Sequence, residues 1–174
     1  MERCTRVLIS DPEEWKGKWR ELMPEAKEGF LELGCGKGRF TAETAAQNPQ
    51  ALYIAVERVP DAMVIAMERV CAQELHNVFF VDGDVAQLPL FFAPGEVDRI
   101  YIKTDNRDLF ELSLFQFPRV GFGVSEVTRD LHADGIHGVM TDYEEKFHNL
   151  GTPINRCVGT MGPLPEVPEP PAEE

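Results

Sequence analysis

The segment 29–40, GFLELGCGKGRF, restricts the possible folds of this chain more than any other. An apolar run of strand type leads into glycines at positions 34, 36 and 38, and residues with a helical pattern follow. Three alternating glycines allow a sharp turn and a close approach of the backbone to a ligand, because they carry no side chains. A strand, a glycine-rich loop and a helix in this order predict an α/β fold that binds a ligand at the loop.

The spacing of the glycines indicates which ligand the loop binds. A dinucleotide-binding loop reads G-x-G-x-x-G. Here the sixth position of that pattern is Arg39, and the last glycine comes one residue earlier, at Gly38. This spacing favours S-adenosylmethionine over NAD. Taken alone, three glycines also fit an ordinary tight turn, and that alternative stays open at this point.

Carboxylates follow the next two apolar runs. Residues 51–56 lead into Glu57, close to the offset of about 20 residues at which a ribose-binding acid is expected after the glycine loop. Residues 78–81 lead into the segment that ends in Asp84. Because the carboxyl ends of parallel strands meet at one rim, we expect these acids to converge where open α/β sheets bind ligands. The alternative is that they are solvated charges at strand ends.

Length and composition indicate an ordinary globular chain. The sequence has 174 residues, of which 43% are hydrophobic and 27% charged. We expect one domain over residues 1–160 and a disordered tail rich in proline and glutamate over residues 161–174. No apolar run is long enough to cross a membrane, and residues 1–10 lack the apolar core of a signal peptide. These features predict a cytoplasmic protein.

Charge and the spacing of metal-ligating residues argue against further classes of function. The net charge of −13 argues against a large nucleic-acid-binding surface, since phosphate contacts require clustered Lys and Arg. Neither the cysteines nor the histidines have the spacing of a metal site, so we predict no bound metal. The residues concerned are Cys4, Cys35, Cys71, Cys157, His76, His132, His137 and His148.

Predicted strands and helices alternate as far as residue 102. Apolar periodicity and proline positions predict helices over residues 11–23, 39–48, 60–75, 108–117 and 141–150, with a short helix within 82–92. Strands are predicted over residues 29–33, 51–56, 78–81, 97–102, 120–128 and 154–158. The alternation predicts a doubly wound α/β architecture with a mainly parallel sheet and right-handed crossovers.

Several segments, taken in order, resemble the bacterial tRNA (guanine-N7)-methyltransferase family. They are DPEEWKGKW, LELGCGKGRF, YIAVE, VDGD, FFAPGEVDRIYI, KTDNRDLFE, DLHAD and MTDYEEKFHNLG. The resemblance implies a Rossmann-like class I methyltransferase with S-adenosylmethionine as methyl donor and tRNA as partner. The implied reaction is transfer of a methyl group to N7 of the guanine at position 46, in the variable loop of tRNA.

The resemblance also implies roles for individual residues. Its cofactor-binding acids match Glu32, Glu57 and Asp84, which join the loop glycines Gly34, Gly36 and Gly38 in the predicted cofactor site. Its tRNA-contacting positions match Asp105, Thr141, Asp142, Tyr143 and Glu144. We therefore expect the first set to surround the cofactor and the second to contact the substrate.

The chain departs from the family pattern between Ile102 and Lys103. In the family, the strand that resembles residues 98–102 is followed by a Pro-Asp-Pro-Trp-Pro-Lys loop, a basic run, a helix and a fifth strand. Here Ile102 joins Lys103 directly, so a helix-and-strand unit of about 40 residues is absent. The absent unit would carry the family's active-site Asp, a substrate-binding Lys and its main basic patch.

This departure has predicted consequences for the sheet and for the site. We expect a remnant sheet of six strands, in which the later strands either pair directly with the fourth strand or leave a gap beside it. Asp105 closely follows the fourth strand and is our candidate for the catalytic carboxylate. Binding of tRNA should be weakened by the loss of the basic loop, and we expect a monomer or a homodimer.

Two alternative functions stay open at the level of the sequence. The first is a non-catalytic remnant or interaction module that binds S-adenosylmethionine, a reading that the absent basic loop favours. The second is a small NAD-dependent oxidoreductase, which the position of Gly38 disfavours. Binding of S-adenosylmethionine without methyl transfer would support the first, and a preference for NAD would support the second.

Overall fold

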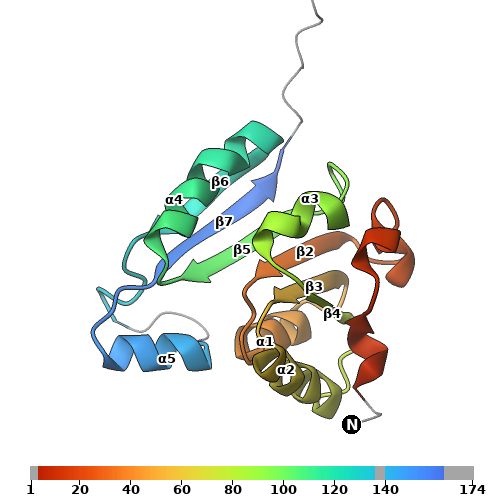
Figure 1. The fold of residues 1–174 in the computed structure, drawn as a ribbon, viewed down its shortest axis with the longest axis horizontal. Helices are drawn as coiled ribbons and strands as arrows, with labels where there is room; N and C mark the ends of the chain where they lie inside the picture. The colour runs from red at the N-terminus through yellow and green to blue at the C-terminus, as the bar shows by residue number, and fades with distance from the viewer. Residues whose placement is uncertain (1–3, 136–139, 163–174) are drawn as a thin grey trace, which may run out of the picture.

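The computed structural model describes residues 4–135 and 140–162, which form one α/β unit around a single sheet (Figure 1). Its strands are β1 (Leu8–Ile9), β2 (Glu28–Leu33), β3 (Ala51–Glu57), β4 (Val78–Asp82), β5 (Arg99–Thr104), β6 (Phe122–Thr128) and β7 (Asn155–Met161). Its α-helices are α1 (Arg39–Gln47), α2 (Pro60–Ala72), α3 (Leu88–Phe91), α4 (Arg107–Gln116) and α5 (Asp142–Asn149). The predicted tail beyond residue 162 and His137 lie outside the described residues.

Six of the seven strands run in the same direction and only β7 is reversed. The order across the sheet is β1-β4-β3-β2-β5-β7-β6. Neighbours from β1 to β5 pair in parallel, whereas β7 pairs antiparallel with both β5 and β6. The predicted doubly wound, mainly parallel α/β fold is confirmed. Among helices of the described ranges, none has the length and apolar character of a membrane span.

Both faces of the sheet are covered, so the central strands are buried on each side. All seven residues of β3 are buried. Alternate side chains of β3 enter different cores, because successive residues of a strand point to opposite faces. Leu52, Ile54 and Val56 pack in the core that includes Phe91 of α3 and Phe110 of α4. Tyr53 and its alternating neighbours pack in the core formed with α1 and α2. In Figure 1, α3 accordingly lies across the sheet from α1 and α2.

The sheet contains one strand more than we predicted. Each of the six predicted strands is present, with ends shifted by at most three residues. The additional strand is β1, which pairs in parallel with β4 through Leu8 and Phe80. A strand of two residues is too short to show an alternating pattern, so only its partner in the folded chain defines it. The expected six-stranded sheet is therefore wrong for the part of the chain that the structure describes.

The predicted helix over residues 11–23 is also wrong. Two 3-10 helices occupy this segment, η2 (Pro12–Trp15) and η3 (Trp19–Leu22). Gly17, between them, has a φ of +81°, which no right-handed helix contains. The bend buries Trp19 completely and lets its indole nitrogen donate a 2.8 Å hydrogen bond to the carbonyl oxygen of Phe91.

The strand β5 contains the junction between Ile102 and Lys103. One of its edges pairs in parallel with β2, where Leu33 lies opposite Ile102. Its other edge pairs antiparallel with β7 along its whole length, ending where Thr104 lies opposite Asn155. We expected the later strands either to pair directly with the strand over residues 97–102 or to leave a gap beside it. The structure contains the direct pairing, because β7 lies next to β5. The residues that follow Ile102 therefore emerge at the rim formed by the carboxyl ends of the parallel strands.

Candidate active site

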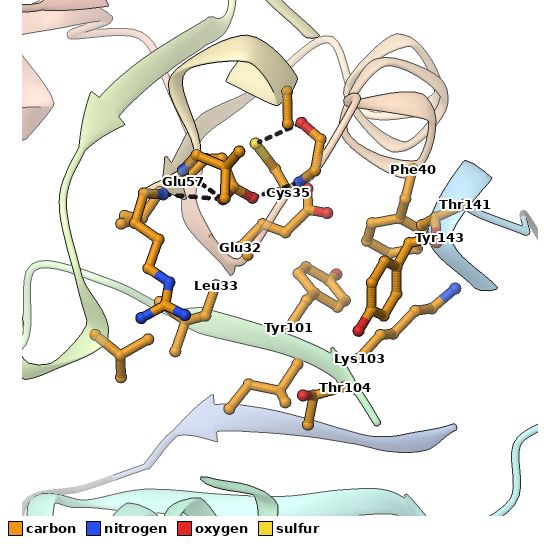
Figure 2. Close-up of a pocket in the computed structure, with 18 of the residues that line it drawn as sticks. Glu32, Leu33, Cys35, Phe40, Glu57, Tyr101, Lys103, Thr104, Thr141 and Tyr143 are labelled. Carbon is orange, nitrogen blue, oxygen red and sulfur yellow. Dashed lines mark hydrogen bonds between the residues drawn. The ribbon is translucent and has the colours of Figure 1, made fainter. Parts of the chain in front are cut away.

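A cavity of about 650 Å³ lies at the carboxyl ends of β2, β3, β4 and β5 (Figure 2). This volume is in the range of small-molecule sites. Figure 2 shows Glu32, Cys35 and Glu57 toward one side and Phe40, Lys103 and Tyr143 toward the other. Most of the predicted site residues line the cavity: Glu32, Gly34, Gly36, Glu57, Asp84, Asp105, Thr141, Tyr143 and Glu144. The side chain of Asp142 lies outside what the structure describes.

The glycine loop forms one wall of the cavity with its backbone. Gly34 and Gly36 have φ values of +77° and +53°, and a Cβ atom at either position would meet open space. Gly38 behaves differently, since a Cβ atom there would lie 2.6 Å from the Cβ of Ala66. The structure therefore places Gly38 outside the cavity wall, in the contact between α1 and α2. The sequence pattern alone could not distinguish a glycine needed for close packing, such as Gly38, from a glycine that contacts a ligand.

Glu57 holds the glycine loop in position from the end of β3. Its Oε2 accepts a 2.7 Å hydrogen bond from the backbone N–H of Gly36. Its Oε1 accepts 2.9 Å hydrogen bonds from the backbone N–H groups of Arg58 and Val59. The carboxylate is buried and lines the cavity. Glu57 thus links the loop after β2 to the turn after β3, and both segments line the cavity.

Glu32 lies deeper in the cavity wall, near the end of β2. It is 5% exposed, and its Oε2 accepts hydrogen bonds from the hydroxyls of Thr41 at 2.7 Å and Tyr53 at 3.0 Å. Burial raises the pKa of Glu32 to about 7, because a charged carboxylate loses its hydration there, and the two hydroxyls only partly oppose this effect. Glu32 is therefore poised to take up or release a proton near neutral pH.

Asp84 completes the acidic side of the cavity after β4. Its Oδ1 accepts a 3.0 Å hydrogen bond from the backbone N–H of Ala86 and caps the 3-10 helix η4 (Val85–Gln87). Its Oδ2 lies 3.4 Å from the guanidinium of Arg58. The side chain is 47% exposed, so the carboxylate is open to a ligand. The structure brings Glu32, Glu57 and Asp84 together around one cavity, as the parallel strands required.

The opposite side of the cavity is formed by residues that follow β5 and begin α5. Asp105 comes directly after β5, and its Oδ1 accepts a 2.6 Å hydrogen bond from the hydroxyl of Tyr143. Burial, followed by this bond to Asp105, raises the pKa of Tyr143, so the phenol keeps its proton and acts as a donor. The ring of Tyr143 packs against Phe147, with 4.3 Å between centroids.

Thr141 and Glu144 form a capping box at the start of α5. The Thr141 hydroxyl accepts a 2.9 Å bond from the Glu144 backbone N–H, and Glu144 Oε2 accepts a 2.7 Å bond from the Thr141 backbone N–H. This reciprocal pair satisfies two donors that the helix itself leaves free. Glu144 is only 1% exposed, although it lines the cavity.

Lys103, at the end of β5, lies in this half of the cavity although its sequence position predicted no site role for it. Lys103 Nζ lies 3.2 and 3.1 Å from the two oxygens of Glu144 and 4.5 Å from the ring centroid of Phe40. Burial lowers the pKa of Lys103, and the nearby Glu144 opposes that effect. The only local signal was that Lys103 precedes Thr104 and Asp105 at the end of a strand, a position that points into such sites.

Arg39 connects the two halves of the cavity. It begins α1, directly after the glycine loop, and its guanidinium donates a 3.0 Å hydrogen bond to the carbonyl oxygen of Met140. The same guanidinium lies 3.7 Å from the carboxylate of Glu145 in α5. Arg39 therefore holds the glycine loop and the start of α5 together.

Comparisons with known proteins agree with this arrangement. A family model described as "Putative methyltransferase" matches residues 26–105, which include the glycine loop, Glu57 at the end of β3 and Asp84 after β4. The tRNA (guanine-N(7)-)-methyltransferase of Streptococcus suis is 37% identical to this chain over 189 residues, covering 87% of this chain and 89% of the relative. The chain belongs to the tRNA (guanine-N(7)-)-methyltransferase family. The Bacillus subtilis member is 34% identical, with the same two coverages.

Solved structures support the fold independently of the family. A structure described as an antibiotic-related methyltransferase has a TM-score of 0.58 at 15% identity, covering 84% of this chain and 92% of that chain. The 16S rRNA methyltransferase KamB has a TM-score of 0.56 at 14% identity, covering 84% and 94%. At such low identity, the likeness establishes the Rossmann-like methyltransferase fold alone.

The alignments with family members are longer than this chain. Those with the Streptococcus suis and Bacillus subtilis members each extend over 189 residues, whereas the chain has 174 residues. The family members therefore contain residues that have no counterpart here.

Proposed function

We propose that this protein transfers a methyl group from S-adenosylmethionine to N7 of a guanine in tRNA, with position 46 as the target. The observation that carries the proposal is that one cavity holds both residue sets that match the family. Glu32, Glu57 and Asp84 line one side of it, and Asp105, Tyr143 and Glu144 line the other. This chain aligns with most of the length of the two tRNA (guanine-N(7)-)-methyltransferases named above, which supports the same reaction.

The residues present fit S-adenosylmethionine. Gly34 and Gly36 leave open space at the cavity wall, so a ligand can approach the backbone there. Glu57 and Asp84 supply carboxylates to hydrogen-bond the adenosine part, and the acidic wall favours a ligand that carries positive charge. When bound, the cofactor supplies an electrophilic methyl group on a sulfonium. The protein's own contribution is to hold the cofactor so that this methyl group faces the half of the cavity lined by Asp105, Tyr143 and Glu144.

The proposed reaction requires no base to remove a proton from the guanine. N7 carries an exposed lone pair, so the attacking atom is already a nucleophile. What the protein contributes is the placement of the guanine and stabilisation of the positive charge that develops on the purine. A carboxylate at the rim meets the second need. Asp105 is the proposed group, because it follows β5 directly and lines the cavity.

We further propose that the chain lacks the family's helix-and-strand unit after Ile102. The length of the alignments and the direct pairing of β5 with β7 support this view. Without the basic loop of that unit, tRNA affinity should be low and steeply dependent on salt, since phosphate contacts supply most of the affinity. We place the protein in the cytoplasm, where tRNA is modified, as a monomer or a homodimer.

Two measurements test the proposed function. Titration calorimetry with S-adenosylmethionine reports cofactor binding, and transfer of a radiolabelled methyl group to unmodified tRNA reports turnover. The matched control is the same tRNA with 7-deazaguanine at position 46, which has carbon in place of the attacking nitrogen. We expect binding, and turnover that the 7-deaza substitution abolishes. Binding without turnover would contradict the proposal and support a non-catalytic binding module.

A further inference from the structure

Glu144 receives hydrogen bonds from donors that lie far apart in the sequence. Lys103 of β5 contacts both carboxylate oxygens, at 3.2 and 3.1 Å. The backbone N–H of Thr141 contacts Oε2 alone, at 2.7 Å, and Nε2 of His132 contacts Oε1 alone, at 3.3 Å. A donor placed symmetrically between two oxygens allows the carboxylate to rotate, whereas donors on separate oxygens fix its plane. His132 and Thr141 together therefore determine the orientation of Glu144.

His132 is buried at this position rather than exposed on the surface. Its side chain is 4% exposed, and its ring lies edge-on to the ring of His148, with 5.3 Å between centroids. The turn that carries it is anchored by a 2.9 Å hydrogen bond from the backbone N–H of Leu131 to the carbonyl oxygen of Ile154. Within the described residues, Nδ1 of His132 has no hydrogen-bond partner. The polar contact of the ring is thus made through Nε2, with Glu144.

We infer that His132 is a positioning residue, which orients the Glu144 carboxylate for the guanine-binding half of the cavity. The inference rests on the proposed function, because it assigns Glu144 to the tRNA side of the site. Glu144 lines the cavity but is almost completely buried, so a small rotation would change what it presents there. A hydrogen bond from His132 prevents that rotation without touching the substrate.

Replacement of His132 tests this role. His132→Gln keeps an N–H donor near the position of Nε2, whereas His132→Leu removes it at similar volume. We expect His132→Leu to lower kcat/KM for tRNA about tenfold, the size of a lost hydrogen bond to a charged group, and His132→Gln to restore most of it. The dissociation constant for S-adenosylmethionine should not change. His76→Leu is the matched control, because it removes an exposed histidine ring that does not line the cavity, and it should have no effect.

A second readout connects His132 to Glu144. In a Glu144→Ala background, which has no side-chain acceptor, His132→Leu should cause little further loss, because residues that act through one contact are not additive. If His132→Leu fails to fold, His132→Asn serves instead, since it is polar but too short to reach Glu144. Equal losses in the Gln and Leu variants, or losses shared by cofactor affinity, would indicate packing alone and overturn the inference.

The outcomes separate this inference from the proposed function. If the unmodified protein methylates tRNA and His132→Leu does so equally well, the positioning role is overturned while the proposed reaction stands. If the unmodified protein shows no turnover, the proposed reaction is wrong. The role of His132 is then tested by comparing the tRNA affinities of His132→Leu and the unmodified protein in a filter-binding assay. An unchanged affinity in His132→Leu, or no tRNA binding by the unmodified protein, would then overturn the inference as well.

Discussion

Tyr143 donates a hydrogen bond to Asp105 on one side of the cavity, with 2.6 Å between the phenolic oxygen and Oδ1, although the two residues are 38 positions apart. This contact joins the end of β5 to the start of α5. Asp105 follows the junction that places β5 beside β7, so its position depends on that pairing. The proposed catalytic carboxylate is therefore oriented by a residue from another element.

Asp105→Ala should lower kcat for tRNA methylation by at least about 100-fold, the usual cost of removing one group that stabilises charge in a transition state. Cofactor affinity should stay the same, because Asp105 lies on the opposite side of the cavity from Glu57. Radiolabel transfer and calorimetry measure the two quantities. Asp108→Ala, at an exposed acid in the first turn of α4, is the control. Unchanged turnover in Asp105→Ala would exclude this residue from catalysis.

Tyr143→Phe should lower kcat/KM about tenfold, because Asp105 loses a hydrogen bond and its orientation. The phenol's raised pKa keeps it protonated, so the pH profile of the unmodified protein should show no loss of activity from tyrosine ionisation up to pH about 9. Steady-state kinetics across pH measure both effects. The idea fails if Tyr143→Phe has normal kinetics while Asp105→Ala does not.

Glu32 should make the free energy of unfolding depend on pH. Its folded pKa of about 7 lies above the ordinary value of 4.5, so between these values the folded state retains a proton that the unfolded state has lost. Its contribution to stability is therefore complete below pH about 4.5, declines as the pH rises and is lost above pH about 7. Glu32→Gln should remove this slope and be more stable by up to about 3 kcal/mol at pH 8.

Urea unfolding at several pH values measures the slope contributed by Glu32. Glu68→Gln, at an exposed position of α2, is the control and should leave the slope unchanged. Parallel pH profiles for Glu32→Gln and the unmodified protein would show that Glu32 is already ionised in the folded state.

Gly38→Ala and Gly36→Ala should differ in their effects, although both replace a glycine of the same loop. Alanine at position 38 would have a positive φ and overlap Ala66, so we expect a loss of about 2–4 kcal/mol in stability. Alanine at position 36 meets open space, so its cost should be about 1 kcal/mol, and its main effect should be weaker cofactor binding. Chemical unfolding and calorimetry measure the two effects. Equal stability losses would contradict the assignment of Gly38 to packing.

Glu57→Gln should weaken cofactor binding at least tenfold. The amide has only one acceptor oxygen, so the backbone N–H of Gly36 or those of Arg58 and Val59 would face an N–H group. An unsatisfied buried donor costs about 1–3 kcal/mol, and the loop would move to avoid it. Calorimetry with S-adenosylmethionine tests this result, and Glu43→Gln on the outer side of α1 is the control. Normal affinity in Glu57→Gln would remove Glu57 from the cofactor site.

The sequence alone determined the fold class and the family, and it predicted most of the residues in the proposed cofactor half of the site. These follow from local patterns, because a buried strand, a glycine loop and an acid after a strand each occupy a few consecutive residues. Because the strands are parallel, Glu32, Glu57 and Asp84 reach the same rim of the sheet whatever path the connecting segments take. For the same reason, six strand positions could be predicted within three residues of their observed ends.

Only the tertiary structure decided the features that depend on distant partners. The strand β1 exists because Leu8 pairs with Phe80, and the bend at Gly17 replaces the predicted helix so that Trp19 can reach Phe91. Direct pairing of β5 with β7 brings Asp105 to Tyr143, and packing rather than spacing separates Gly38 from the other glycines. His132 likewise contacts Glu144 only in the folded chain. Such contacts depend on which surfaces the folded chain brings together, and no local period encodes that choice.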